Sequence, residues 1–196
     1  KSDDYQALLN YWSGNGPAPT VESATATMME LAESLKTENC EFKPDVVDAM
    51  FRQVYSDEIR PFKEVQSIPG VVFATDFDLG VVGSAYSDTK TANYHVSTGN
   101  YTEWNTGWSY RNDGVDVQPS SDDVNSNGYN VGWLATDEWM KYSVDVEMSG
   151  LYDVELRVAA GADDGTFHFE MDGADISQPL AVANSGGWDN WTTIVL

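Results

Sequence analysis

The spacing of apolar residues changes along this chain, from a helical period to an alternating one, near residue 68. Within residues 20–35 the apolar side chains recur every three or four positions, whereas within residues 154–158 they alternate with polar ones. A period of 3.6 indicates an amphipathic helix and a period of two indicates a half-buried strand. The sequence therefore predicts an α+β chain, with a helical segment over 1–66 and a β-rich region over 68–196.

Three short amphipathic helices are expected in the helical segment. The first covers Tyr5 to Trp12, Thr20 can cap the second, and Pro44 suits the first turn of the third. The apolar side chains of the third helix are expected to be buried, and they are Val47, Met50, Phe51 and Val54. Three such helices make a thin core alone, so we expect them to pack on a larger body, as a remnant of a catalytic domain or a docking region.

Short strands separated by turn residues are expected after the boundary at Glu64–Gly70. Asp172-Gly173 is a tight-turn signal between two alternating runs, and Trp139 lies in such a run, where we expect it in the core. Glycines punctuate the strands at short intervals. This pattern is typical of an antiparallel β-sandwich.

The acidic balance of the chain narrows its partners. The formal net charge is −22, and 20 of the 32 acidic residues lie in the β-rich region. Because nucleic-acid binding needs a cationic surface, we expect no nucleic-acid partner, and by the same argument no anionic membrane surface. Cys40 is the only cysteine, so no internal disulfide or cysteine zinc cluster is possible. No apolar run is long enough for a transmembrane helix.

Six of the seven tryptophans lie between positions 104 and 191. Large aromatic rings on loops between strands can act as platforms for sugar rings, because the electron-rich ring face attracts the C–H groups of a pyranose. The loop over residues 86–110 is rich in aromatics that either extend such a surface or pin the loop to the sandwich: Tyr94, Tyr101, Trp104, Trp108 and Tyr110.

The order of short motifs in the β-rich region resembles a family-6 carbohydrate-binding module over about residues 68–196. The motifs that carry the resemblance are Ile68-Pro69-Gly70, Asp76-Phe77-Asp78, Tyr110-Arg111-x-Asp113-Gly114-Val115-Asp116-Val117, Tyr129-Asn130-Val131-Gly132-Trp133, Glu138-Trp139-x-x-Tyr142, Leu156-Arg157-Val158-Ala159 and Gly186-Gly187-Trp188-x-x-Trp191-Thr192-Thr193. Each motif is weak alone, and their ordered succession is specific.

The resemblance implies a jelly-roll β-sandwich that binds plant, algal or fungal polysaccharide and is appended to a secreted glycoside hydrolase. It places two cleft walls at Trp133 and Trp191, and it places Gln118 where the family often has an acidic residue that hydrogen-bonds the sugar. We add Trp188 and Asn190 as further carbohydrate-binding candidates. The implied partners are a polysaccharide or oligosaccharide and a linked catalytic domain, and the implied location is extracellular.

The sequence departs from the family at two places. The family usually has acidic residues in its first strand that help to hold a structural calcium ion, and here those positions are Phe73 and Thr75. Calcium is therefore in doubt. The resemblance also places a final hairpin beyond Leu196, so we expect either that the sandwich lacks its last strands or that another segment fills that edge.

The helical segment resembles, less specifically, the trailing helices of a family-5-like glycoside hydrolase. The turn Tyr11-Trp12-x-Gly14-Asn15-Gly16-Pro17 and the helix at 48–53 carry this similarity. It implies that the parent protein is a glycoside hydrolase whose catalytic barrel lies outside this chain.

Catalysis by the chain itself has little support in the sequence. A glycosidase needs a specific pair of carboxylates, and no motif marks one among the acids, which we expect mostly in turns or at the surface: Asp76/Asp78, Asp113/Asp116 and Asp163/Asp164. Neither His95 nor His168 has a serine or cysteine elbow nearby. The run Asp123-x-Asn125-x-Asn127-Gly128 is better explained by turn chemistry than by a calcium loop. A hydrolase and a structural or adhesion module remain the alternatives to a binding module.

Overall fold

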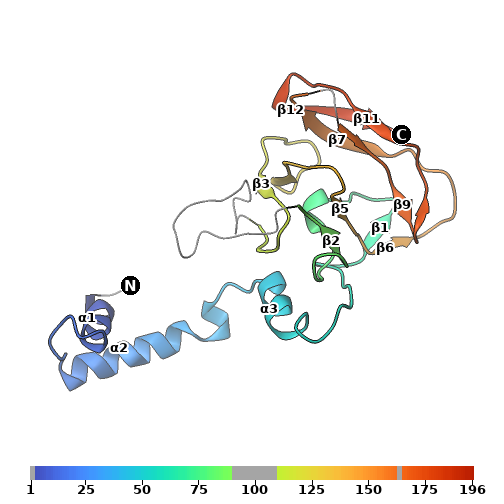
Figure 1. Ribbon diagram of the computed structural model, residues 1–196. Coiled ribbons are helices and arrows are strands. Elements are labelled where there is room, and N and C mark those ends of the chain that lie inside the picture. Colours follow the sequence, from blue (N-terminus) through green and yellow to red (C-terminus); the bar gives the residue numbers. More distant parts are fainter. Residues whose placement is uncertain (1–2, 90–109, 163–164) are drawn as a thin grey trace. The chain divides into compact units, whose positions relative to one another are not determined.

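The structure is a computed structural model that describes residues 3–89, 110–162 and 165–196 (Figure 1). The chain divides into two compact units, Lys1–Lys43 and Pro44–Leu196, which we describe separately. Within the described residues, no helix combines the length and apolar character needed to span a membrane. Some expected site residues lie outside the described residues, namely Tyr94, His95, Tyr101, Trp104, Trp108, Asp163 and Asp164.

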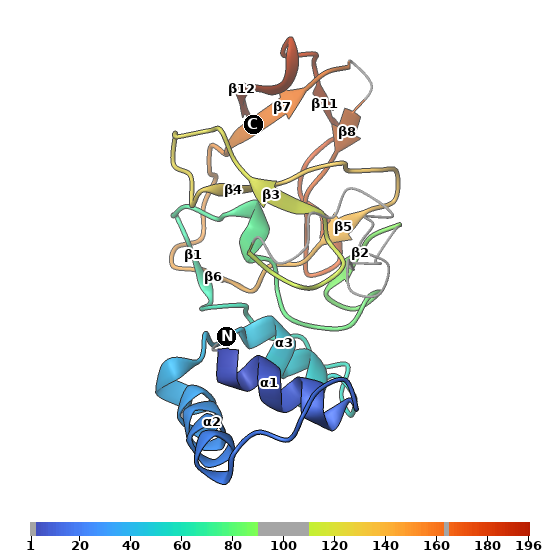
Figure 2. The same cartoon turned by 90° about the vertical axis from the view of Figure 1, so that its left-hand side faces the viewer.

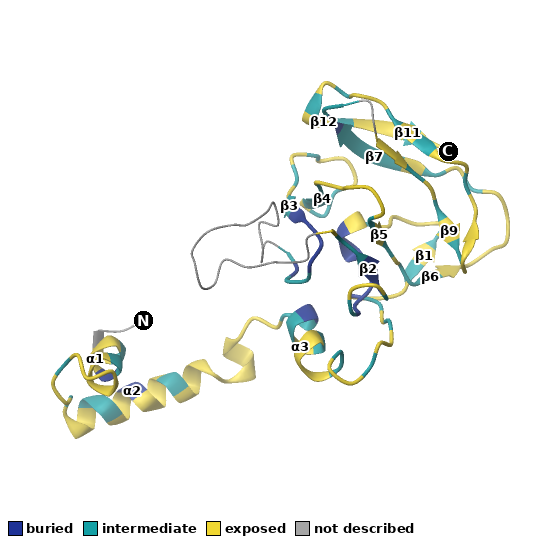
Figure 3. Cartoon of the chain, viewed as in Figure 1, coloured by how far each residue is buried: buried dark blue, intermediate teal, exposed yellow. Residues whose placement is uncertain are grey.

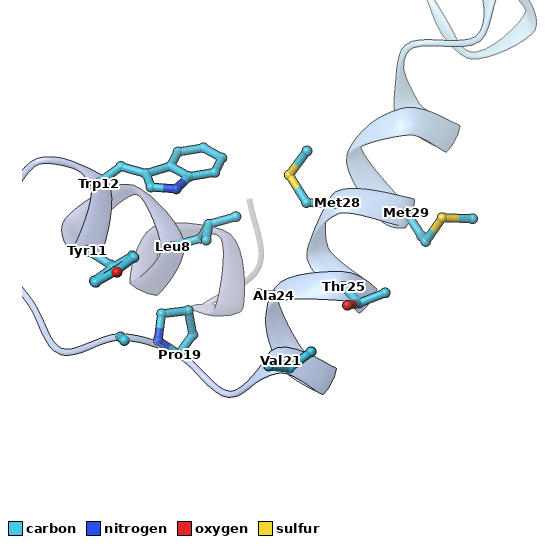
Figure 4. A pocket seen from close by; sticks show the side chains of 10 residues that line it. Leu8, Tyr11, Trp12, Pro19, Val21, Ala24, Thr25, Met28 and Met29 are labelled. Atoms are coloured by element: carbon cyan, nitrogen blue, oxygen red, sulfur yellow. The ribbon is translucent and has the colours of Figure 1, made fainter.

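The first unit contains two helices, α1 (Asp3–Trp12) and α2 (Val21–Ser34), followed by a short 3-10 turn, η1 (Thr37–Asn39). Thr20 caps α2 as predicted, because its side-chain oxygen accepts a 3.1 Å hydrogen bond from the Ser23 backbone N–H. Leu8 and Thr27 are buried where the helices meet. Beside them, Trp12, Leu8 and Met28 border a shallow apolar pocket (Figure 4).

The third helix, α3 (Pro44–Phe51), begins the second unit at the expected proline. The prediction that its apolar face is buried is wrong, because Met50 and Phe51 are more than 60% exposed. The buried side chain is instead Asp45, whose carboxylate accepts a hydrogen bond from the Asn112 backbone N–H. A polar contact, rather than the apolar stripe, therefore holds this helix against its neighbours.

Twelve short strands form six two-stranded ladders in the described part of the second unit (Figures 1 and 2). Two ladders matter most for the site: β3 (Val117–Pro119) with β4 (Tyr129–Val131), and β7 (Glu155–Ala160) with β12 (Gly187–Val195), both antiparallel. The remaining pairs are β1 (Gln66–Ile68) with β6 (Val144–Val146), which is parallel, and the antiparallel pairs β2 (Tyr86–Ser87) with β5 (Trp139–Met140), β8 (Gly165–Phe167) with β11 (Leu180–Val182), and β9 (Glu170–Met171) with β10 (Ala174–Asp175).

The predicted order of helices followed by many short strands is confirmed. The described ladders do not join into the two continuous sheets of a closed sandwich, so the jelly roll itself stays a prediction. The expected domain boundary at Glu64–Gly70 lies inside the second unit and also stays a prediction.

The main core of the second unit is built around Phe77, which is fully buried with Ala85, Tyr86, Val115 and Val117 (dark blue in Figure 3). Phe77 and Tyr86 meet edge to face, with ring centroids 5.5 Å apart. Phe77 directly follows the short 3-10 turn η2 (Ala74–Asp76), and Val117 of β3 is part of the same core.

A buried arginine stabilises this core from within. The Arg111 side chain is fully enclosed, and its guanidinium lies 3.5 Å from the ring centroid of Phe77 and 4.2 Å from that of Phe62. It also forms an ion pair of 2.5 Å with Asp113. Burial raises the pKa of the Asp113 carboxyl, although the charge and hydrogen bonds of Arg111 oppose that rise.

Several acids that the sequence placed in turns or at the surface are buried instead. Asp78 accepts hydrogen bonds from the Ser143 backbone N–H at 2.9 Å and from its hydroxyl at 2.8 Å. Asp76 accepts hydrogen bonds from Tyr110 and Lys63, and Asp116 is buried as well. Partners distant in sequence make this burial tolerable, and the local pattern does not reveal them.

The expected core position of Trp139 is also wrong, because its side chain is 37% exposed. Among the described residues, β5 pairs with β2 alone, and the ammonium group of Lys141 covers the indole at 5.1 Å from its centroid.

Candidate functional site

Strand β12 bulges outward where its tryptophans lie. Its pairing with β7 passes from Gly187 opposite Ala160 directly to Thr192 opposite Val158, so the residues between Gly187 and Thr192 have too few partners on β7. Extra residues in one strand bend it and re-aim its side chains. In the bulge, side chains therefore do not follow the regular alternation of a strand, and the residues concerned are Trp188, Asp189, Asn190 and Trp191.

Trp188 is the most exposed tryptophan on the bulge, with 71% of its surface accessible. One edge of its indole lies against Gly161, where an added Cβ atom would come within 2.6 Å of Cε2 and 2.8 Å of Nε1. Only a residue without a side chain leaves room for this approach. Gly161 therefore makes room for one edge of the ring, which stays open to solvent.

Trp191 is half-buried, and its indole Nε1–H donates a 3.1 Å hydrogen bond to the Ser121 hydroxyl. Ser121 belongs to the connection between β3 and β4. The same connection is fixed by Asp122, whose carboxylate accepts two hydrogen bonds of 2.8 Å from Arg157. Arg157 also donates a 3.0 Å hydrogen bond to the Thr193 hydroxyl, so one arginine joins β7, β12 and the β3–β4 connection.

Trp133 follows β4, and its backbone adopts a positive φ of 50°. Tyr129 and Val131 alternate toward the core, and the left-handed backbone at Trp133 breaks that alternation. As a result the ring is 40% exposed rather than buried with them. A positive φ is uncommon for a bulky residue and directs attention to function.

Glu138 holds the loop that carries Trp133. Its carboxylate accepts a 2.8 Å hydrogen bond from the Ala135 backbone N–H and hydrogen bonds of 3.0 and 2.6 Å from the backbone and hydroxyl of Thr89. These contacts tie the loop after β4 to the end of β2. The orientation of the ring is therefore supported by a side chain that the sequence motifs did not single out for this role.

The two predicted amide groups lie at different places. Gln118 is half-buried in β3, directly opposite Asn130 of β4. Asn190 lies on the β12 bulge, and its Nδ2 is close enough to Gly186 that an added Cβ there would lie 3.1 Å away. Each amide can both donate and accept hydrogen bonds.

The described contacts bring together some of these residues but not all. Trp188, Asn190 and Trp191 share the bulge, and Ser121 ties Trp191 to the Pro119–Tyr129 end of the β3–β4 ladder. Trp133 follows the opposite end, where the Gly132 backbone N–H donates a hydrogen bond to the Asp116 carbonyl oxygen, and at about 3.3 Å per residue the two ends of this three-residue ladder are roughly 7–10 Å apart. The pairing of Trp133 and Trp191 as walls of one cleft stays a prediction.

Comparison with known protein families decides what this tryptophan-bearing region is. The model of the carbohydrate binding module (family 6) matches residues 107–195. This part of the chain is a family-6 carbohydrate-binding module. The match contains every residue predicted for sugar binding, from Gln118 to Trp191. The resemblance carried by the ordered motifs is therefore confirmed for this region of the chain.

The module-bearing chain is also similar to the beta-agarase AgaA of Microbulbifer thermotolerans, with 26% identity over 72 residues. The aligned part is 37% of this chain and 17% of that protein. The chain thus spans only a small part of the relative's length, and the activity of that whole enzyme does not transfer with the similarity.

Family-6 modules often bind calcium, so the ligands of such an ion can be compared with the residues present. Phe73 offers no side-chain oxygen. The Thr75 side chain is 1% exposed, and its hydroxyl already accepts a 2.9 Å hydrogen bond from the Asn127 amide. Calcium binding requires several oxygen ligands around one point, and these two positions do not fit that set.

The calcium-like run between Asp123 and Gly128 behaves as the predicted turn. Asn127 Oδ1 accepts a 3.1 Å hydrogen bond from the Tyr129 N–H two residues on, and Asn125 and Gly128 have positive φ values. Among the described residues, Gly161, Ser121 and Glu138 are the supporting positions that sequence reasoning missed. Of these three, only Gly161 carried a signal in the sequence, because a glycine at the end of a strand often marks a close approach of another group.

Proposed function

We propose that the chain binds polysaccharide by stacking sugar rings on the tryptophans of its family-6 module. The observation that carries this proposal is the open indole of Trp188, which rests against Gly161. A flat aromatic ring that is held along one edge and is otherwise exposed suits the C–H face of a pyranose. Such a platform has little conformational freedom to lose on binding.

Trp133 and Trp191 are the other stacking rings in this proposal. The positive φ at Trp133 supports a role in binding, because backbone outliers of bulky residues cluster at ligand sites. Each ring contributes roughly 1–3 kcal/mol, by analogy with bases stacked on aromatic side chains. Trp191 contributes less than Trp188, because it is half-buried and offers less open ring surface.

Gln118 and Asn190 hydrogen-bond sugar hydroxyls in this proposal. Both amides are neutral, which suits a neutral polysaccharide better than an acidic one in a chain whose net charge is −22. The first polysaccharide to consider is agarose, because the similar protein from Microbulbifer thermotolerans is named as a beta-agarase. Plant and algal β-glycans form the wider class.

The module acts as a targeting domain for a linked glycoside hydrolase that is secreted. Binding holds the catalytic domain at a high effective concentration of substrate without any new catalytic contact. The role is consistent with family membership, and no acid pair among the described residues is marked as a catalytic pair by a motif.

Affinity electrophoresis of the purified chain tests this function. Gels that contain agarose, xylan, soluble cellulose derivatives or β-1,3-glucan should retard the chain in at least one case, with no release of reducing ends from that polysaccharide. Migration unchanged in every gel contradicts carbohydrate binding. Release of reducing ends that one Asp or Glu substitution abolishes would instead identify the chain as a hydrolase.

A further inference from the structure

A histidine and two carboxylates meet on one exposed face of the hairpin formed by β9 and β10. The turn Asp172-Gly173, with φ values of 51° and 78°, has the two positive angles that a tight hairpin turn requires. This turn fixes the register, in which Glu170 lies directly opposite Asp175. His168 precedes Glu170 by two residues and therefore projects to the same side of the chain.

The apolar residues Phe167 and Phe169 alternate in sequence with His168 and Glu170. The rings of Phe167 and Phe169 meet edge to face, with centroids 5.7 Å apart at 87°. Because side chains alternate along an extended segment, the two phenylalanines and the three polar groups occupy opposite faces. Packing of the phenylalanine face thus holds the polar face outward.

The three polar groups converge on one point. His168 Nε2 lies 3.2 Å from Glu170 Oε1 and 3.3 Å from Asp175 Oδ1, and the three ligand atoms are all within 4.8 Å of one another. An ion about 2.0–2.1 Å from the nitrogen and either oxygen would see each pair at an angle of roughly 105°, near the tetrahedral geometry that zinc prefers.

The charges of this cluster favour a cation. Two carboxylates directly opposite each other on paired strands repel. One Nε2–H can donate one good hydrogen bond, yet both carboxylates approach that same nitrogen. Among the described residues, no lysine or arginine forms an ion pair with Glu170 or Asp175. A metal ion would neutralise both acids and use the imidazole as a third ligand.

We propose that His168, Glu170 and Asp175 form a binding site for a divalent transition-metal ion of the zinc type. One imidazole nitrogen with two carboxylate oxygens suits zinc and its neighbours, whereas calcium prefers six to eight oxygen ligands. Three protein ligands leave a fourth position for water. The ion would join the residue between β8 and β9 to β10, and the site involves none of the tryptophans proposed for sugar binding.

Calorimetric titration of the full chain with Zn²⁺, after chelator treatment and dialysis, tests the site. Cys40 is exposed and thiolates bind zinc, so the parent protein for all titrations should carry Cys40→Ser. We expect one zinc ion per chain. His168→Ala and the near-isosteric Asp175→Asn should each weaken binding by at least about tenfold, since loss of even an outer-shell partner costs 10–100-fold. Both positions are exposed, so neither change removes a core contact.

The second histidine of the chain provides the matched control. His95→Ala should leave zinc affinity unchanged, and replacing zinc with Co²⁺ should give the strong visible absorption of a tetrahedral site that His168→Ala removes. Absence of zinc binding by the parent protein, or zinc binding that survives His168→Ala or Asp175→Asn, overturns the proposal.

Discussion

The guanidinium of Arg157 donates two hydrogen bonds of 2.8 Å to the carboxylate of Asp122. Asp122 stands next to Ser121, the hydrogen-bond partner of Trp191, and Arg157 also bonds to Thr193 two residues beyond that tryptophan. A bidentate pair fixes orientation as well as distance. Arg157 therefore fixes both segments that hold Trp191, namely the β3–β4 connection and strand β12.

Removal of the Arg157–Asp122 pair should weaken sugar binding without removing a sugar contact. Arg157→Ala frees the β3–β4 connection from β7 and β12, so we expect a lower melting temperature and a weaker affinity for the retained polysaccharide. Ser121→Ala, which deletes only the hydrogen bond to Trp191, should lower affinity with little change in melting temperature. Equal affinities for both variants and the parent would show that the position of Trp191 is irrelevant.

The ion pair between Arg157 and Asp122 should also make the stability of the protein depend on pH. Hydrogen bonds from Arg157 lower the pKa of the Asp122 carboxyl below its usual value. The stabilisation is therefore complete above the unfolded pKa of about 4, and it is lost as the pH falls through the lower folded pKa. The stability difference between the parent and Arg157→Ala, followed by urea unfolding, should shrink below about pH 4. A difference that grows under acid would contradict this assignment.

Gly161 should be required for binding but not for folding. In Gly161→Ala the new Cβ would lie 2.6 Å from Trp188, so the exposed indole must move. We expect at least a fivefold loss of affinity, within the roughly 1–3 kcal/mol that one stacking ring contributes, and a nearly unchanged melting temperature. Gly150→Ala is the matched control, because an added Cβ there meets nothing within 4 Å.

The buried arginine should be the most sensitive position for stability. Arg111→Ala removes the guanidinium charge that pairs with the Asp113 carboxylate, and breaking such a buried pair costs about 3–5 kcal/mol. The double variant Arg111→Ala, Asp113→Asn should recover part of that loss, because position 113 no longer carries a charge. Urea unfolding measures both. A loss under 1 kcal/mol for the single variant would mean that the carboxylate escapes to solvent.

Local signals account for what the sequence predicted well. The Thr20 cap and the Asp172-Gly173 turn depend on residues within a few positions, and both are present. The ordered motifs predicted the family-6 module for the same reason, since each motif is a short and local pattern.

Long-range partners account for what the sequence missed. Asp76 is buried because Tyr110, 34 residues away, donates a hydrogen bond to it. The apolar face of α3 stays exposed because Asp45 supplies the buried contact instead. The bulge at Trp188 depends on the register of β12 against β7, and periodicity within one strand cannot specify a register.

The hydrogen bond between Asn127 and Thr75 bears on calcium. Asn127→Ala removes a partner from the buried Thr75 hydroxyl, so we expect a loss of about 1–2 kcal/mol in the free energy of unfolding. The loss should be the same with and without a chelator, because neither Phe73 nor Thr75 fits a calcium ligand set. A melting temperature that falls sharply with chelator in the parent would show that other residues hold a structural metal.

Calorimetry of tryptophan variants against the retained polysaccharide tests the central claim most directly. Trp188→Ala and Trp133→Ala should each weaken binding by about fivefold or more, as expected from roughly 1–3 kcal/mol per stacking ring. Trp139→Ala, which removes an exposed ring of the same module outside the proposed surface, should bind like the parent. Unchanged affinity in both Trp188→Ala and Trp133→Ala, or an equal loss in Trp139→Ala, would contradict binding by these rings.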